Sequence, residues 1–166
     1  MTKKPNDEAR TFFVNTRFQI MARRPGGVPR ERAIERAQTN INELKPGFAD
    51  WLDNKLPEMT AAIRQIERDS GDAALLDEAY WNCCQLRDVG ATMGFELLTH
   101  ISDNLCKILK TMKAGSAYQK ESIECHIDAL ILASKAPYCN LHPDQLPEMT
   151  SGLRRVVERA GGSQPK

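Results

Sequence analysis

The sequence predicts an all-α protein, because apolar and small residues recur three and four positions apart along much of its 166 residues. The clearest instance is a pair of stripes on either side of Gly94. The first stripe is Leu75, Ala79, Cys83, Leu86, Gly90 and Met93. The second stripe is Leu98, Ile101, Leu105, Ile108 and Met112. Two helices that meet at a glycine and pack face to face form a helical hairpin, from which a bundle can be built.

The first 28 residues are expected to form a basic tail with scattered apolar side chains. This tail ends at the Arg-Arg-Pro-Gly-Gly run of residues 23–27, a sequence that breaks regular structure. Two alternatives stay open for it. It is either a mobile extension, or a docking segment that becomes ordered on a partner, since its apolar residues exceed what a linker needs.

A helical bundle is expected to follow over residues 29–162. Its first helix should begin at Pro29, a residue suited to a first turn, and end at Pro46. A break over residues 45–47 should separate it from a second helix over residues 48–68. Pro57 should kink or split that second helix, because proline removes an intrahelical hydrogen bond.

The remaining helices are predicted from the same spacing. A third begins after residues 70–72 and carries the first stripe, and residues 113–117 form a loop after the second. Another helix over residues 118–135 should face inward with Ile123, Ile127, Leu130, Ile131 and Ser134. The last helix should begin near Pro147 and end at residues 161–162, leaving a short tail over residues 163–166.

Composition excludes several classes of partner. Lysine and arginine total 23 against 22 acidic residues, so a net charge of +1 gives no reason to expect nucleic acid or an acidic membrane surface. The sequence has no apolar run long enough to cross a bilayer. Five cysteines in no regular framework indicate reduced thiols, and we therefore expect a cytoplasmic protein.

A second stripe on the helix before Gly94 carries the chemistry. Tyr80, Cys84, Arg87 and Ala91 recur at helical spacing and lie beside the core stripe rather than on it. A thiol on this flank should be half-exposed, with a guanidinium one turn away and small residues beyond it. Such a surface suits a partner protein that approaches the helix closely.

The run from Cys84 to Phe95 resembles the signature helix of histidine-phosphotransfer (HPt) domains. The family pattern is roughly His-x-Leu-(Lys/Arg)-Gly, followed by small residues and a closing glycine. Leu86, Arg87 and Gly94 match the leucine, the basic residue and the closing glycine, and residues 90–92 match the small region. The resemblance covers roughly residues 30–135, with a motif core over residues 75–112. It implies a four-helix bundle with additional N- and C-terminal helices.

Two departures from the family pattern decide the expected function. Cys84 stands where the phosphoaccepting histidine belongs, and Asp88 stands in place of a glycine. The resemblance then implies a pseudo-phosphotransfer protein of a bacterial two-component pathway. It would bind a response-regulator receiver domain or a sensor kinase without relaying phosphate. The partner-docking residues would be Tyr80, Arg87, Asp88, Gly90, Ala91 and Gly94 around Cys84.

The sequence is compatible with two other functions. A structural bundle without a phosphorelay role and a thiol-based redox sensor acting through Cys84 both stay open. A disulfide between Cys83 and Cys84 would be strained, because neighbouring helical residues point apart. Cys83 is instead expected to be a buried, small apolar residue. No catalytic motif is present, so we expect neither an enzyme nor a cofactor.

Histidines and the remaining cysteines raise the question of a metal. Four residues could in number make up a zinc site: Cys125, His126, Cys139 and His142. Cys125 and His126 are neighbours on a helix and point apart, so we expect no metal. His126 is expected to be packed and hydrogen-bonded. His100 is expected to face solvent.

Overall fold

The computed structural model describes residues 16–22, 26–68 and 72–162, and every regular element within these ranges is helical. The prediction of an all-α protein is confirmed. The chain divides into two compact units, Met1–Gln38 and Thr39–Lys166. The role of residues 1–28 as a tail stays a prediction, since most of them, like residues 163–166, lie outside the described ranges.

The first unit contains the short helix α1 (Arg17–Ala22), which lies inside the segment expected to be a tail. Its described apolar side chains are exposed, with Ile20 at 52% and Met21 at 53%. The long helix α2 (Arg30–Arg68) carries residues of both units. Ile34, in the part of α2 that belongs to the first unit, is also exposed.

The predicted break at residues 45–47 is wrong, because α2 continues through Pro46. A proline inside a helix costs roughly 3 kcal/mol in lost hydrogen bonding and steric conflict. Aromatic packing just after it favours the continuous helix. The ring of Phe48 stacks on Trp51 at 5.4 Å between centroids and meets Phe95 edge-on at 4.9 Å. These contacts fix the turn that follows Pro46 against the bundle.

Pro57 does not split α2 either. Leu56 and Met59 are buried on either side of it, while Pro57 itself is exposed. The carbonyl of Asp53 loses its usual intrahelical donor at this position. Because Asp53 is also exposed, water can replace the missing N–H, and the helix tolerates the proline.

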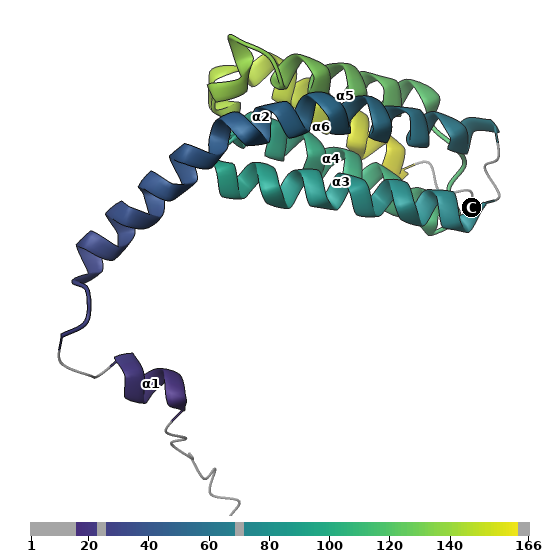
Figure 1. Cartoon of the computed structure of the whole chain (residues 1–166). Coiled ribbons are helices and arrows are strands. Elements are labelled where there is room, and N and C mark those ends of the chain that lie inside the picture. The colour runs from purple at the N-terminus through teal and green to yellow at the C-terminus, as the bar shows by residue number, and fades with distance from the viewer. Residues whose placement is uncertain (1–15, 23–25, 69–71, 163–166) are drawn as a thin grey trace, which may run out of the picture. The chain divides into compact units, whose positions relative to one another are not determined.

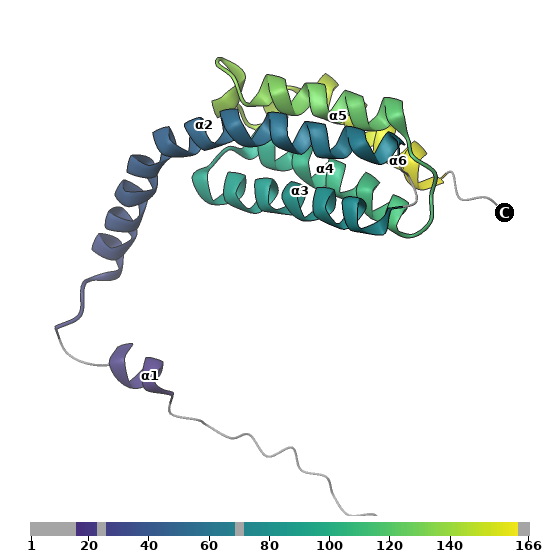
Figure 2. The ribbon, with the colours of Figure 1, turned by 45° about the vertical axis from the view of Figure 1, so that its right-hand side comes forward.

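The second unit is a helical bundle. After the later part of α2 come α3 (Ala73–Met93), α4 (Glu96–Lys113), α5 (Lys120–Ala133) and α6 (Pro147–Gly162). Two 3₁₀ turns, Tyr138–Asn140 and Pro143–Gln145, precede α6. Helix α4 is central, since it packs against α3, α5 and α6. Figures 1 and 2 show α3 running alongside α4, and the later part of α2 running alongside α5.

The core confirms most of the predicted stripes. All five residues of the stripe after Gly94 are buried, and Ala79, Cys83, Leu86 and Gly90 are buried in the stripe before it. Ile131 was expected to face inward, but it is 44% exposed. The buried face of α5 passes through Leu130 and Ala133 instead, so Ile131 lies at its edge.

Candidate functional site

Helix α3 starts and stops at positions that local chemistry explains. Asp72 caps its first turn, with its carboxylate accepting hydrogen bonds from the N–H groups of Ala74 (2.8 Å) and Leu75 (3.4 Å). Gly94 ends it with φ of 79°, a left-handed conformation that glycine adopts without strain. The chain then reverses directly into α4. This hairpin fixes which residues of α3 and α4 face one another.

The structure brings the predicted flank residues onto one surface of α3. Tyr80, Cys84 and Arg87 are half-buried, and Asp88 and Ala91 are exposed. We call these five residues the Cys84 face. Gly94 is exposed at the end of the same helix. Docking of a partner on this face stays a prediction.

Gly90 differs from the other predicted docking residues because it is buried between the two helices. A Cβ atom at this position would lie 3.0 Å from Thr99 Oγ1 and 3.4 Å from a methyl carbon of Leu98. The glycine therefore allows α3 and α4 to approach closely. Its contribution to the Cys84 face is indirect, through the packing beneath that face.

The thiol of Cys84 meets a second thiol across the hairpin. Its Sγ lies 3.6 Å from Sγ of Cys106, which is a buried residue of α4. Burial, followed by the hydrogen bond with Cys106, raises the pKa of Cys84 above the ordinary thiol value. The charge of Arg87 acts to lower this pKa, but burial outweighs it.

Among Cys83, Cys84 and Cys106, the thiolate form is favoured on Cys106. The neighbouring thiols, Cys83 first and then Cys84, lower the pKa of Cys106 below its ordinary value, against the effect of burial, and Arg87 adds to the lowering. The neighbouring Cys106 and complete burial raise the pKa of Cys83. The thiol of Cys83 donates its hydrogen bond to the carbonyl of Ser102 at 3.3 Å. The prediction that Cys83 is buried is confirmed.

Sequence reasoning did not identify Cys106 as a neighbour of Cys84. The signal was present in the hairpin itself, because the two cysteines lie at similar separations before and after Gly94. In an antiparallel helical pair, residues at matching separations from the turn meet across the interface. The position of the turn was predicted, but the pairing across it was not worked out.

Charged groups of both signs surround the Cys84 face. Arg87 contacts Asp88 through Nε at 2.8 Å and Asp103 through Nη1 at 3.7 Å, and the hydrogen bond to Asp88 raises the pKa of Arg87. Lys107 also pairs with Asp103 at 2.7 Å. Toward the start of α3, the ammonium of Lys113 lies 4.8 Å from the ring centre of Tyr80. The surface is thus mixed in charge.

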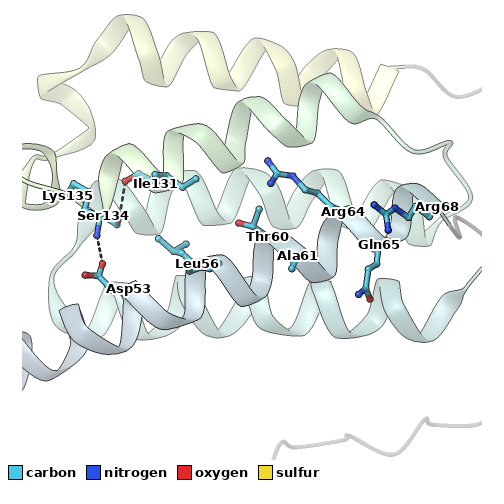
Figure 3. Close-up of a pocket in the computed structure, with 11 residues that line it drawn as sticks. Asp53, Leu56, Thr60, Ala61, Arg64, Gln65, Arg68, Ile131, Ser134 and Lys135 are labelled. Carbon is cyan, nitrogen blue, oxygen red and sulfur yellow. Dashed lines mark hydrogen bonds and ion pairs between the residues drawn. The ribbon is translucent and has the colours of Figure 1, made fainter.

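A second candidate site, not predicted from the sequence, lies between α2 and α5. This α2–α5 groove has a volume of about 600 Å³. It is lined by Asp53, Leu56, Pro57, Thr60, Ala61, Arg64, Gln65, Arg68, Ile131, Ser134 and Lys135. Figure 3 shows Lys135 meeting Asp53 at one end, with Arg64 and Arg68 toward the other. Between them lie Leu56 and Ile131, so the groove has an apolar middle and charged ends.

The ion pairs that border the groove also join α2 to α5. Arg64 donates two hydrogen bonds to the carboxylate of Glu124, at 2.8 and 2.7 Å. This pairing lowers the pKa of Glu124. Lys120 pairs with Glu67 at 2.7 Å further along. The charges at these positions are therefore largely neutralised within the chain.

The histidines occupy different surroundings. His126 is fully buried, and its Nδ1 lies 2.7 Å from the carbonyl of Ser122, so the prediction of a packed, hydrogen-bonded histidine is confirmed. The prediction that His100 faces solvent is wrong, because this residue of α4 is half-buried and meets Asn104. Its flank of α4 is covered, and burial lowers the pKa of His100.

Metal-ligating side chains do not converge in the described part of the chain. No three histidine, cysteine, aspartate or glutamate residues there are placed to hold an ion together. Cys125 is exposed on α5 while its neighbour His126 is buried, so the two diverge. His142 instead pairs with Glu96 at 2.9 Å.

Comparisons of this chain with protein-family models, with curated proteins and with solved structures found no match. Among the helices of the described residues, none has both the length and the apolar character that a membrane crossing requires.

Proposed function

We propose that this chain is an HPt-like binding protein of a bacterial two-component pathway. It docks a response-regulator receiver domain on the Cys84 face and does not relay phosphate itself. A sensor kinase is the other partner that a protein of this class would bind. The fold proposed with this function is a four-helix bundle formed by the later part of α2 with α3, α4 and α5, to which α6 is added.

The observation that carries the proposal is the position of Cys84. It lies on the flank of α3, half-buried, at the residue where the HPt pattern has its phosphoaccepting histidine. Arg87 and Ala91 share this surface, one and two turns further along the helix. The absence of a large side chain at Ala91 supports close approach by a partner, and the mixed charges around Arg87 support specific orientation.

Phosphoryl transfer through Cys84 is not part of the proposal. An imidazole offers a nucleophilic nitrogen near neutral pH, whereas a thiol reacts as its thiolate. Burial raises the pKa of Cys84, so the thiolate is scarce at neutral pH. The face therefore suits binding better than catalysis.

The test combines binding with label transfer. A panel of receiver domains, with and without phosphate, is titrated into the wild-type chain by calorimetry, and transfer of labelled phosphate is followed on a gel. Wild type is expected to bind at least one receiver domain without taking up label. Cys84→His is expected to bind the same domain and to gain label.

Two matched variants locate the binding surface. Ala91→Arg places a large side chain on the Cys84 face, and Ala61→Arg makes the same change at an exposed position in the α2–α5 groove. Ala91→Arg should weaken binding at least tenfold, while Ala61→Arg should not change it. The reverse pattern would move the docking surface to the groove. Binding by no receiver domain, with or without phosphate, would overturn the proposal and leave a helical scaffold.

A further inference from the structure

Three thiols from two helices gather beneath the Cys84 face. Cys84 and Cys106 place their sulfur atoms 3.6 Å apart, and Cys83 lies next to them with its thiol directed to the carbonyl of Ser102. Gly90 allows the close approach of α3 and α4 that brings these groups together. The cluster joins a half-buried thiol on the surface to buried thiols behind it.

We propose that Cys84 and Cys106 are a redox pair, which a hydroperoxide converts to a disulfide that links α3 to α4. The proposal does not depend on docking of a receiver domain. It concerns a covalent modification of the chain itself, and its test requires no partner.

Geometry selects this pair among the three cysteines. The two sulfur atoms are already in contact, and a disulfide at about 2.05 Å requires them to approach by roughly 1.5 Å more. Rotation of the two side chains, which lie on facing helices, would supply this movement. Cys83 and Cys84 are neighbours on one helix and diverge, so a bond between them is strained. Cys83 is also fully buried, which keeps it from an oxidant in solution.

The reaction proceeds in two balanced steps. The thiolate of Cys84 attacks one oxygen of hydrogen peroxide, the O–O bond breaks, and hydroxide leaves and takes up a proton to become water. Cys84 is then a sulfenic acid. The thiolate of Cys106 attacks the sulfur of this group, the S–O bond breaks, and a second hydroxide is protonated to water. Two thiols have lost two electrons, and one peroxide has been reduced to two waters.

Access and thiolate formation favour different thiols of the pair. Burial raises the pKa of Cys84, so the first step uses a minor thiolate population and should be slow at neutral pH and faster as the pH rises. Cys84 is the more accessible of the two, so peroxide reaches it first. Cys106 is only 3% exposed and is shielded from peroxide, but it lies in contact with the sulfenic acid formed on Cys84. The neighbouring thiols, Cys83 first, lower the pKa of Cys106 and favour the thiolate that the second step needs. An added dithiol reverses the bond by thiol–disulfide exchange.

The experiment uses the full chain, reduced and freed of reductant, and treats it with hydrogen peroxide. Free thiols are counted over time, and the oxidised chain is digested without reduction and mapped by mass spectrometry. Wild type should lose two of its five thiols together and yield a peptide pair joined through Cys84 and Cys106. Dithiothreitol should restore both thiols.

Variants separate the two steps. Cys106→Ser should stop at the sulfenic acid of Cys84, which a dimedone probe traps. Cys84→Ser alters a half-buried position and keeps the buried core intact, and it should form no cross-link even if Cys106→Ser fails to fold. Cys125→Ser, at an exposed cysteine of α5, is the matched control and should cross-link at the wild-type rate.

Two outcomes would overturn the proposal. One is oxidation of all five thiols at similar rates with no Cys84–Cys106 peptide. The other is a cross-link that joins Cys83 to Cys106, which would assign the redox pair to different residues.

Discussion

The α3–α4 hairpin and the α2–α5 pair are joined in different ways. In the hairpin, the buried Gly90 lets the helices approach so closely that thiols from both meet beneath the surface. Helices α2 and α5 instead leave a groove of about 600 Å³ between them, bordered by ion pairs such as Arg64–Glu124.

The difference shows how one helical bundle can offer two kinds of surface. In the closely packed hairpin, a thiol and a guanidinium lie side by side on one helix face. The wider separation of α2 and α5 leaves a groove, which has an apolar middle and charged ends. The following predictions test how far the stability of the fold follows this division.

The largest expected effect is the loss of a buried aliphatic side chain under the hairpin. Leu105→Ala removes a fully buried side chain of α4 and should lower the free energy of unfolding by about 2–5 kcal/mol. Ile131→Ala, in the groove, removes a side chain that is 44% exposed and should cost less than about 1 kcal/mol. Urea denaturation of both variants checks this. Equal losses would mean that the groove is as tightly packed as the hairpin.

A smaller effect is expected from crowding the helix contact itself. Gly90→Val places a branched side chain where a single Cβ atom already lies 3.0 Å from Thr99, and should cost about 1–3 kcal/mol. Gly152→Ala in α6 has open space around its Cβ atom, and should stabilise the chain by up to about 1 kcal/mol. Thermal unfolding monitored by circular dichroism measures both. A stabilising Gly90→Val would show that the helices separate at no cost.

The side chain that caps the start of α3 should contribute a moderate amount to the free energy of unfolding. Asp72→Ala removes the carboxylate that accepts hydrogen bonds from Ala74 and Leu75, and should cost about 1 kcal/mol. Asp72→Asn retains an acceptor oxygen and should remain within a few tenths of a kcal/mol of wild type. Denaturation midpoints compare the pair. A large loss in Asp72→Asn would indicate that the charge, not the cap, stabilises α3.

The smallest effect is expected at the rim of the groove. Arg64→Gln and Glu124→Gln, combined in a double-mutant cycle, should give a small favourable coupling that declines as salt is added, because Arg64 is exposed. Arg64 lowers the pKa of Glu124, so the coupling is complete above about pH 4.3 and is lost as the pH falls through the lowered value. A coupling that is insensitive to salt and pH would contradict a solvent-screened pair.

The sequence predicted the hairpin better than the rest of the fold, for a physical reason. The stripes before and after Gly94 are periodic, and the glycine stands where a left-handed turn is needed, so the information is local. Pro46 also gave a local signal, but Phe48 packs on Phe95 from a distant part of the chain and overrides it. Tertiary contacts of this kind are invisible to a reading of neighbouring residues.

The candidate site likewise has features that depend on local sequence and features that depend on tertiary contacts. The half-buried position of Cys84 followed from helical periodicity alone. Its contact with Cys106 depends on how the two helices align, and the groove depends on α5 lying beside α2, to which no local pattern points. Ile131 was assigned to the core by spacing, although it stands at the edge of the groove.

The burial of His126 should make the free energy of unfolding depend on pH. Its Nδ1 donates to Ser122, which leaves Nε2 as a buried, unprotonated nitrogen for which no hydrogen-bond partner lies among the described residues. Burial lowers the pKa of His126, and nearby His100 adds to the lowering, whereas an unfolded chain takes up this proton near pH 6.5. The unfolded state therefore binds more protons below pH 6.5, and the native state should become less stable as the pH falls from there toward the lowered value. A series of urea titrations between pH 7.5 and 5 should show this decline in wild type and a shallower one in His126→Gln.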